Sequence, residues 1–423
     1  MELLLYTLRT VSYAIVEPSH LLILVVLGLV FYTKNKRISM MQKMTIGESL
    51  NSPLELTLSQ IVLGIIAGAV GSIILSTLGI VFNKNSGIEL IFMFSLLLLF
   101  VKKRFVCFSY SGSILGLLSI IFALVSTKLN IQSYINVNIV SLMTFVGVLH
   151  IVEGFLVMFD GGRGALPVFS NRNGKIVGGF AFNRYWALPV AIFIAFSGTV
   201  PSETITSTIQ TPGWWPIINK LETSKLLLTM VISAIPLYGI IGYNSVTFTK
   251  EKKKKTLYSG IGILIYGISL VIISQIANLG VIGQIIVVIY APLGHEFMIK
   301  TLNKLEEKGS YIYVSDEEGI AVLEVSPTSP AYEAGIRRGD KIIKINNNRV
   351  FSEVEIFEAV RDSIYDISLV VKSISGEILE RKIKPRNKKI GILLVPKMVR
   401  REDALDINND DFKKILDDLK RKH

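Results

Sequence analysis

The first 300 residues of this chain consist of long apolar runs separated by short polar or basic segments. About 20 apolar residues are enough to cross the hydrocarbon core of a membrane as a helix. Nine runs reach or approach this length, at 13–32, 54–82, 88–101, 107–125, 139–158, 185–200, 226–243, 257–273 and 279–299. Hydrophobic residues make up 50% of the chain, which excludes an ordinary soluble globular protein. We predict an α-helical polytopic membrane bundle of nine transmembrane helices, or eight if the first run is re-entrant.

Basic residues cluster between the apolar runs. They lie at 34–43, 102–104, 163–184 and 250–255, where five of six residues are lysine. Nine crossings place all of these clusters on one side, and because Lys and Arg are enriched in cytoplasmic loops, that side is the cytoplasm. The N-terminus is then outside and the chain after residue 300 is cytoplasmic. This topology also explains the formal net charge of +12, so we expect no nucleic-acid partner.

The last part of the chain has a mixed, charged composition and short periodic segments. Alternating apolar residues predict strands at 320–325, 341–345, 367–371 and 378–383, with a further strand at 390–395. Ser352 is suited to cap a helix over 353–363. Cys107, the single cysteine, lies outside this part, so no disulfide can form within the chain. These segments predict a small cytoplasmic α+β domain.

The segment from Gly319 to Asn346 contains a strand, then Ser-Pro-Ala-x-x-Ala-Gly-Ile, Gly-Asp and Ile-x-x-Ile-Asn in order. This series resembles bacterial PDZ domains, and the resemblance covers about 309–396. It implies a groove between the strand 320–325 and the helix 353–363, in which an extended peptide adds as a further strand. The residues expected to form this groove are Gly319, Ile320, Ala321, Val322, Ile356, Phe357 and Val360. The alternative is that some of them are core residues of the domain.

Ionisable residues inside a membrane are costly and therefore often functional. Four lie in the predicted spans, namely His150, Glu153, His295 and Glu296, and Asp160 lies just below the first pair. His295-Glu296 begins like the HExxH metal motif, but Ile299 stands where the second histidine would be, so we assign no catalytic residue, metal or cofactor. We favour a hydrogen-bonded cluster between helices that fixes their packing. A composite metal site of His150, Glu153, His295 and Asp160, and a proton or ligand pathway, are the alternatives.

The whole layout is a bundle at 1–300, a PDZ domain at 309–396 and a short charged amphipathic helix at 400–423. It resembles the MinJ-type membrane proteins of Gram-positive division-site selection, as does the Gly-His-Glu run at 294–296. The resemblance implies a plasma-membrane scaffold without enzyme activity, at the septum and poles, that binds DivIVA-like and MinD-like division proteins. A site-2-protease-like intramembrane protein, with Ile299 against it, and a PDZ-regulated transporter or sensor are the alternatives.

Overall fold

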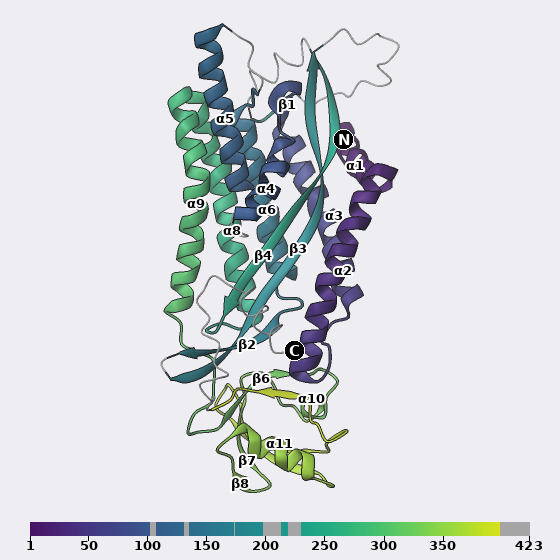
Figure 1. Cartoon of the computed structure of the whole chain (residues 1–423), viewed down its shortest axis with the longest axis vertical. Helices are drawn as coiled ribbons and strands as arrows, with labels where there is room; N and C mark the ends of the chain where they lie inside the picture. Colours follow the sequence, from purple (N-terminus) through teal and green to yellow (C-terminus); the bar gives the residue numbers. More distant parts are fainter. Residues whose placement is uncertain (102–106, 131–134, 173, 198–212, 219–229, 398–423) are drawn as a thin grey trace.

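A computed structural model of the chain describes residues 1–101, 107–130, 135–172, 174–197, 213–218 and 230–397. It has two parts along its long axis (Figure 1). The larger part, up to Glu307, contains long helices and a long β-hairpin, and the smaller part is a sheet domain that follows it. This confirms the predicted order of a membrane bundle and a small α+β domain.

Five helices of the described residues are long and apolar enough to cross a membrane. They are α3 (Pro53–Leu78), α5 (Phe108–Leu129), α6 (Ile139–Asp160), α8 (Lys252–Ser274) extended by the 3₁₀ turn η4 (Gln275–Leu279), and α9 (Val281–Glu307). A sixth candidate is the pair α1 (Glu2–Val16) and α2 (Pro18–Ile46), which is bent by 66°. The described part of α4 (Leu90–Val101) has 12 residues.

The predicted helices at 185–200 and 226–243 are wrong, because their described residues form strands. β3 (Lys175–Ser197) and β4 (Met230–Thr247) pair as an antiparallel hairpin that runs along the larger part (Figure 1). Pro189 and Pro236 lie within these runs, and proline in a helix interior removes a hydrogen bond and clashes with the preceding turn. Hydropathy alone cannot separate an apolar helix from an apolar strand, so the helix count was too high.

β3 is the strand around which the larger part is assembled. It pairs with β4, β1 (Val81–Asn83), β2 (Leu166–Arg172) and β5 (Tyr313–Val314). α3 packs directly on it, since a Cβ atom on Gly64 would lie 2.1 Å from the carbonyl oxygen of Ala187. The small residues of α3 therefore allow close contact with a strand.

Two predicted cytoplasmic loops are also regular structure. The basic segment 34–43 continues α2 to Ile46, and the segment 163–184 contains β2 and the beginning of β3. Both segments lie toward the end of the bundle that carries the sheet domain (Figure 1).

The smaller part has the predicted PDZ elements at nearly the predicted positions. Its strands are β6 (Ile320–Val325), β7 (Lys341–Ile345), β8 (Asn348–Arg349), β9 (Ile367–Lys372), β10 (Ile378–Ile383) and β11 (Ile392–Leu394), and its helices are α10 (Pro330–Glu333) and α11 (Glu353–Asp362). The sheet order is β10-β9-β7-β6-β11, and β8 pairs with β7. The predicted helix at 400–423 lies outside the described residues.

The two parts share a hydrophobic contact through β6, whose residues are buried on both faces. Ile320 and Val322 belong to the core of the PDZ domain, whereas Ala321 and Leu323 belong to the core of the larger part. β6 faces the bundle and α11 lies on the far side (Figure 1). The PDZ domain is therefore packed against the bundle.

Candidate functional site

The predicted groove wall on β6 is not available to a peptide, because both of its edges are paired. Ile320 and Ala321 pair with β7, and Val322, Glu324 and Val325 pair with β11. The backbone N–H of Ala321 donates to Ser315 Oγ at 2.9 Å, and that of Val322 donates to the Asp340 carbonyl at 2.8 Å. The placement of the groove at Gly319–Val322 is therefore a wrong prediction. An incoming strand cannot add to β6.

β11 is the strand at the end of the sheet. Among the strands that the structure describes it pairs with β6 alone, so its other edge faces no strand. α11 runs beside it in the opposite direction. The N–H of Lys397, after β11, donates to Glu353 Oε2 at 3.4 Å at the start of α11. Asp362 is the last residue of α11, and its pKa is lowered by a hydrogen bond from Arg361 and further by the charge of Lys388. Lys388 precedes β11, so the end of α11 lies near the start of β11.

The three α11 residues of the predicted groove differ in exposure. Ile356 and Val360 are buried in the PDZ core, as are Ile320 and Val322 of β6, so the core alternative holds for these four. Phe357 is 45% exposed. An exposed aromatic ring on the helix next to an unpaired strand edge is suited to hold a peptide side chain. The candidate peptide site is therefore the β11 edge with Phe357.

A buried carboxylate joins the PDZ domain to the bundle. Glu324, on β6, is fully buried, and Lys252 at the start of α8 donates to it at 2.6 Å. Arg338 of the PDZ domain forms an ion pair with the other carboxylate oxygen. Burying a charge is costly unless it is paired, so this arrangement favours one placement of the domain. We name Glu324, Lys252 and Arg338 the junction.

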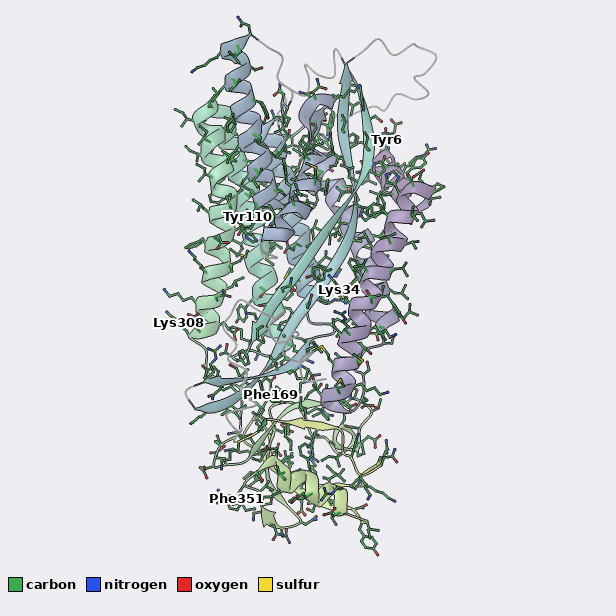
Figure 2. The ribbon with its side chains drawn as sticks, in the orientation of Figure 1. Tyr6, Lys34, Tyr110, Phe169, Lys308 and Phe351 are labelled. Carbon is green, nitrogen blue, oxygen red and sulfur yellow. The ribbon has the colours of Figure 1, made fainter. Side chains whose placement is uncertain are left out.

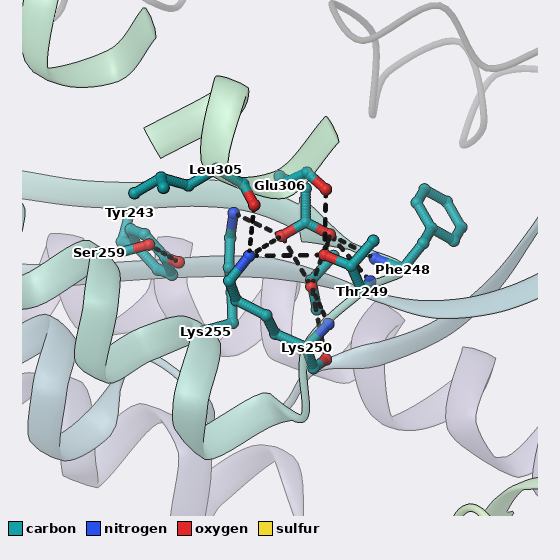
Figure 3. A network of polar contacts seen from close by, with 9 residues as sticks. Tyr243, Phe248, Thr249, Lys250, Lys255, Ser259, Leu305 and Glu306 are labelled. Carbon is teal, nitrogen blue, oxygen red and sulfur yellow. Dashed lines mark hydrogen bonds and ion pairs between the residues drawn. The ribbon is translucent and has the colours of Figure 1, made fainter. Parts of the chain in front are cut away.

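A second carboxylate fixes the end of α9, from which the chain enters the PDZ domain. Glu306 accepts hydrogen bonds from the backbone N–H groups of Phe248 and Thr249, both at 2.9 Å, and from the Thr249 hydroxyl at 2.7 Å. Lys250 and Lys255 lie 3.4 Å from it (Figure 3). The sequence analysis read these lysines as an orientation signal and missed this network.

The predicted intramembrane polar residues meet, in part, midway along the bundle. The rings of His150 on α6 and His295 on α9 lie 5.6 Å apart, and Tyr266 on α8 contacts both. Glu153 Oε2 lies 3.9 Å from His150 Nε2. Glu296 accepts a hydrogen bond from Tyr110, whose place in the bundle is labelled in Figure 2. α6 and α9 therefore bring the four predicted residues to one region, with Tyr266 of α8 between the two histidine rings.

Two other residues are placed differently from the prediction. Asp160 does not join this region, because it accepts a hydrogen bond from Trp186 Nε1 at 2.9 Å and pairs with the buried Arg184, both on β3. Cys107, which the sequence analysis did not include, lies with its Sγ 2.9 Å from His150 Nε2. Its position at the start of an apolar run gave no signal, since only the packing of α5 on α6 brings it to His150. We name Cys107, His150 and His295 the histidine cluster.

Comparison with known proteins finds a PDZ domain and a division protein. A family model described as PDZ domain matches residues 322–366. The chain is 22% identical over 236 residues to the cell division topological determinant MinJ of Bacillus subtilis, covering 55% of each protein. It is 38% identical over 72 residues to the serine endoprotease DegS of Haemophilus influenzae, covering 17% of this chain and 21% of that one. The chain thus spans about half and about a fifth of these relatives.

These matches agree with the order of the two parts of the structure. They confirm the PDZ domain and the similarity to MinJ, and with the apolar helices they support a PDZ-containing membrane adaptor. The match to DegS is short and does not carry an enzymatic activity to this chain.

Proposed function

We propose that this protein is a membrane-anchored adaptor whose PDZ domain binds peptide segments of partner proteins in division-site selection or cell polarity. The observation that carries the proposal is the edge of β11 that none of the described strands pairs with, beside α11, in a PDZ domain packed on the bundle through β6. Addition of a peptide strand to this edge supplies main-chain hydrogen bonds, and Phe357 supplies an apolar contact.

The distribution of charge supports a cytoplasmic PDZ domain. The basic residues of α2, at 34–43, and of α8, at 252–255, lie toward the end of the bundle that carries this domain. Because cytoplasmic ends of membrane helices are rich in Lys and Arg, this end is the inner one in our proposal. A site held at the inner membrane surface raises the effective concentration of partners already there, so weak peptide binding is sufficient.

The similarity to MinJ supports division proteins as the partners. We propose DivIVA-like polar proteins and MinD-like division inhibitors as the proteins recruited, and the septum and poles of the plasma membrane as the location. The adaptor has no catalytic role in this proposal.

The test is the localisation of fluorescent DivIVA-like and MinD-like proteins in cells that produce the Phe357→Asp variant. Ile378→Asp is the matched control, because Ile378 is 62% exposed and lies on β10 at the opposite end of the sheet. We expect Phe357→Asp to displace at least one partner while the variant stays in the membrane, and Ile378→Asp to displace none. Unchanged partner positions in both variants would overturn the proposal.

A further inference from the structure

The histidine cluster lies at the meeting point of three helices and has the donor atoms of a metal site. Cys107 is the N-cap of α5, His150 lies within α6 and His295 within α9. One ligand atom from each of the three residues can be chosen so that all lie within 4.8 Å of one another. Both histidines are buried, at 1% and 7% exposure. Thiolate and imidazole together are a preferred ligand set for zinc.

The hydrogen bond at Nδ1 of His150 shows which of its two ring nitrogens, Nε2, can act as a metal ligand. Nδ1 lies 2.7 Å from the carbonyl oxygen of Val146, and because a carbonyl only accepts, Nδ1 carries the proton. In the neutral ring Nε2 then has a lone pair. In metal sites, the ring nitrogen of a histidine that does not bind the metal commonly donates a hydrogen bond to a backbone carbonyl, as Nδ1 of His150 does here.

The neighbouring hydroxyls do not compete for this lone pair. Ser109 Oγ lies 3.1 Å from His150 Nε2 and 2.8 Å from the Tyr266 oxygen. Because Tyr266 donates its proton to the carbonyl of Ala291 at 2.7 Å, Ser109 donates its single proton to Tyr266 and not to His150. The remaining donor to His150 Nε2 is the thiol of Cys107, at 2.9 Å. A metal ion that replaces this thiol proton would bind both Cys107 Sγ and His150 Nε2, the two atoms that the hydrogen bond now joins.

His295 supplies an independent observation. Its Nδ1 is buried and has no hydrogen-bond partner among the residues that the structure describes. The ring is surrounded by three other rings, His150, Tyr110 and Tyr266, with centroids 5.5–5.6 Å away. A buried polar atom without a partner is unfavourable and indicates a ligand that is not part of the chain.

We propose that Cys107, His150 and His295 bind a Zn²⁺ ion between α5, α6 and α9. Zn²⁺ bonds of about 2.3 Å to sulfur and about 2.0 Å to nitrogen put the donor atoms about 3.3–3.6 Å apart. The Cys107–His150 separation of 2.9 Å therefore widens on binding, and His295 moves toward the pair. The Cys107 thiol releases its proton to solvent. Glu153, 3.9 Å from His150 Nε2, is the nearest candidate for the fourth position.

The charges of this set suit an apolar bundle. One thiolate and the Glu153 carboxylate balance the two positive charges of Zn²⁺, and a neutral set avoids the cost of a net charge in the bundle. Bound metal would join three helices that are already held by side-chain packing and by hydrogen bonds such as that from Tyr110 to Glu296. This proposal is independent of the peptide site, because the histidine cluster lies midway along the bundle (Figure 2).

The test uses the full chain purified in detergent, treated with a chelator and dialysed against Zn²⁺. We expect about one zinc per chain, and its loss in Cys107→Ser and in His295→Gln. His20→Gln is the matched control, because His20 lies at the start of α2 beside Glu17 and outside the cluster, and it should retain the zinc. Serine is close in size to cysteine and can also donate to His150, so Cys107→Ser should keep the fold.

A second measurement needs no variant. Titration of the chelated wild-type protein with Co²⁺ should produce the near-ultraviolet thiolate-to-cobalt charge-transfer band, because Cys107 is the single cysteine of the chain. Zn²⁺ should then remove this band by displacement. Zinc content in the wild type no higher than in Cys107→Ser, or a Co²⁺ titration without the band, would overturn the proposal and leave a hydrogen-bonded cluster.

Discussion

β6 and β11 are neighbours in the PDZ sheet, and they differ at their edges rather than at their faces. On both strands, alternate side chains point into the core of the PDZ domain and toward the core of the bundle. Val322 and Leu394 lie in the PDZ core, while Leu323 and the neighbouring Leu393 pack on the core of the bundle. β6 is paired on both edges, whereas β11 is paired on one among the described strands.

This difference separates two tasks within one sheet. One face of β6, with Ala321 and Leu323, fixes the domain to the bundle, and the junction around Glu324 adds a charged contact of defined geometry. In our proposal, the edge of β11 that no described strand pairs with is left for recognition. A partner bound there would meet a surface that is fixed relative to the bundle, so in this proposal the bundle acts as more than a tether.

The two faces of β6 should respond differently to a buried charge, and this is the largest effect that we expect. Val322→Asp places a carboxylate in the PDZ core and should unfold that domain, at a cost well above about 3 kcal/mol. Leu323→Asp should detach a folded PDZ domain from the bundle. Limited proteolysis with hydrogen exchange in detergent distinguishes these results, and identical cleavage patterns would contradict the division of β6 between two cores.

The second-largest expected effect is a loss of stability on substitution at the junction. Glu324→Gln removes the charge that pairs with Lys252 and Arg338, and it should destabilise the docked state by about 1.5–3 kcal/mol. Glu333→Gln is the matched control, because Glu333 pairs with Arg386 on the surface and should change stability by less than about 1 kcal/mol. Thermal unfolding of the full chain measures both, and equal shifts would remove the distinction between junction and surface.

The edge of β11 should respond in binding and not in stability. Phe357→Asp changes a half-exposed residue, so we expect a stability change within about 1 kcal/mol. Affinity for a partner peptide should fall at least about tenfold, which corresponds to about 1.4 kcal/mol. Fluorescence anisotropy with peptides from captured partners measures this, with Ile378→Asp as reference. A loss of stability without a loss of affinity would place Phe357 in the core instead.

The smallest effect concerns an exposed pair on the PDZ domain. A hydrogen bond from Lys372, and then the charges of Lys372 and Lys341, lower the pKa of Glu318 below its ordinary value of 4.5. A lowered carboxyl pKa stabilises the folded state above pH 4.5, and this stabilisation is lost as the pH falls through the folded pKa. Lys372→Ala should therefore slightly reduce the loss of the free energy of unfolding as the pH is lowered below about 4.5, measured by denaturant unfolding at a series of pH values. An unchanged loss would show that the pair contributes nothing.

The PDZ domain could be predicted from the sequence because its signals are local. Turn residues such as Gly335 and Gly339, both with positive φ, and the Ser352 cap mark its elements within one or two residues. The position of its peptide edge could not, since the pairing of β11 with β6 joins segments distant in the chain. The β3–β4 hairpin was missed because apolar length does not report backbone conformation, although Pro189 and Pro236 were a signal against a helix.

The intramembrane residues show the same limit. The energetic cost of ionisable groups inside a membrane singled out His150 and His295, whose rings lie 5.6 Å apart. Cys107 is an ordinary apolar-run residue in the sequence, and it joins them only because α5 packs on α6. Asp160 shares α6 with His150, yet its side chain meets Arg184 on the unpredicted β3.

The most direct test of the adaptor proposal is photo-crosslinking in living cells with the probe at position 357, and with position 378 as the reference. Both residues are exposed on the PDZ domain, but they lie on α11 beside β11 and on β10 at the other end of the sheet. We predict that position 357 captures division or pole-organising proteins and that position 378 does not. The same products at both positions, or none at 357 in protein that is correctly inserted, would contradict recognition at the β11 edge.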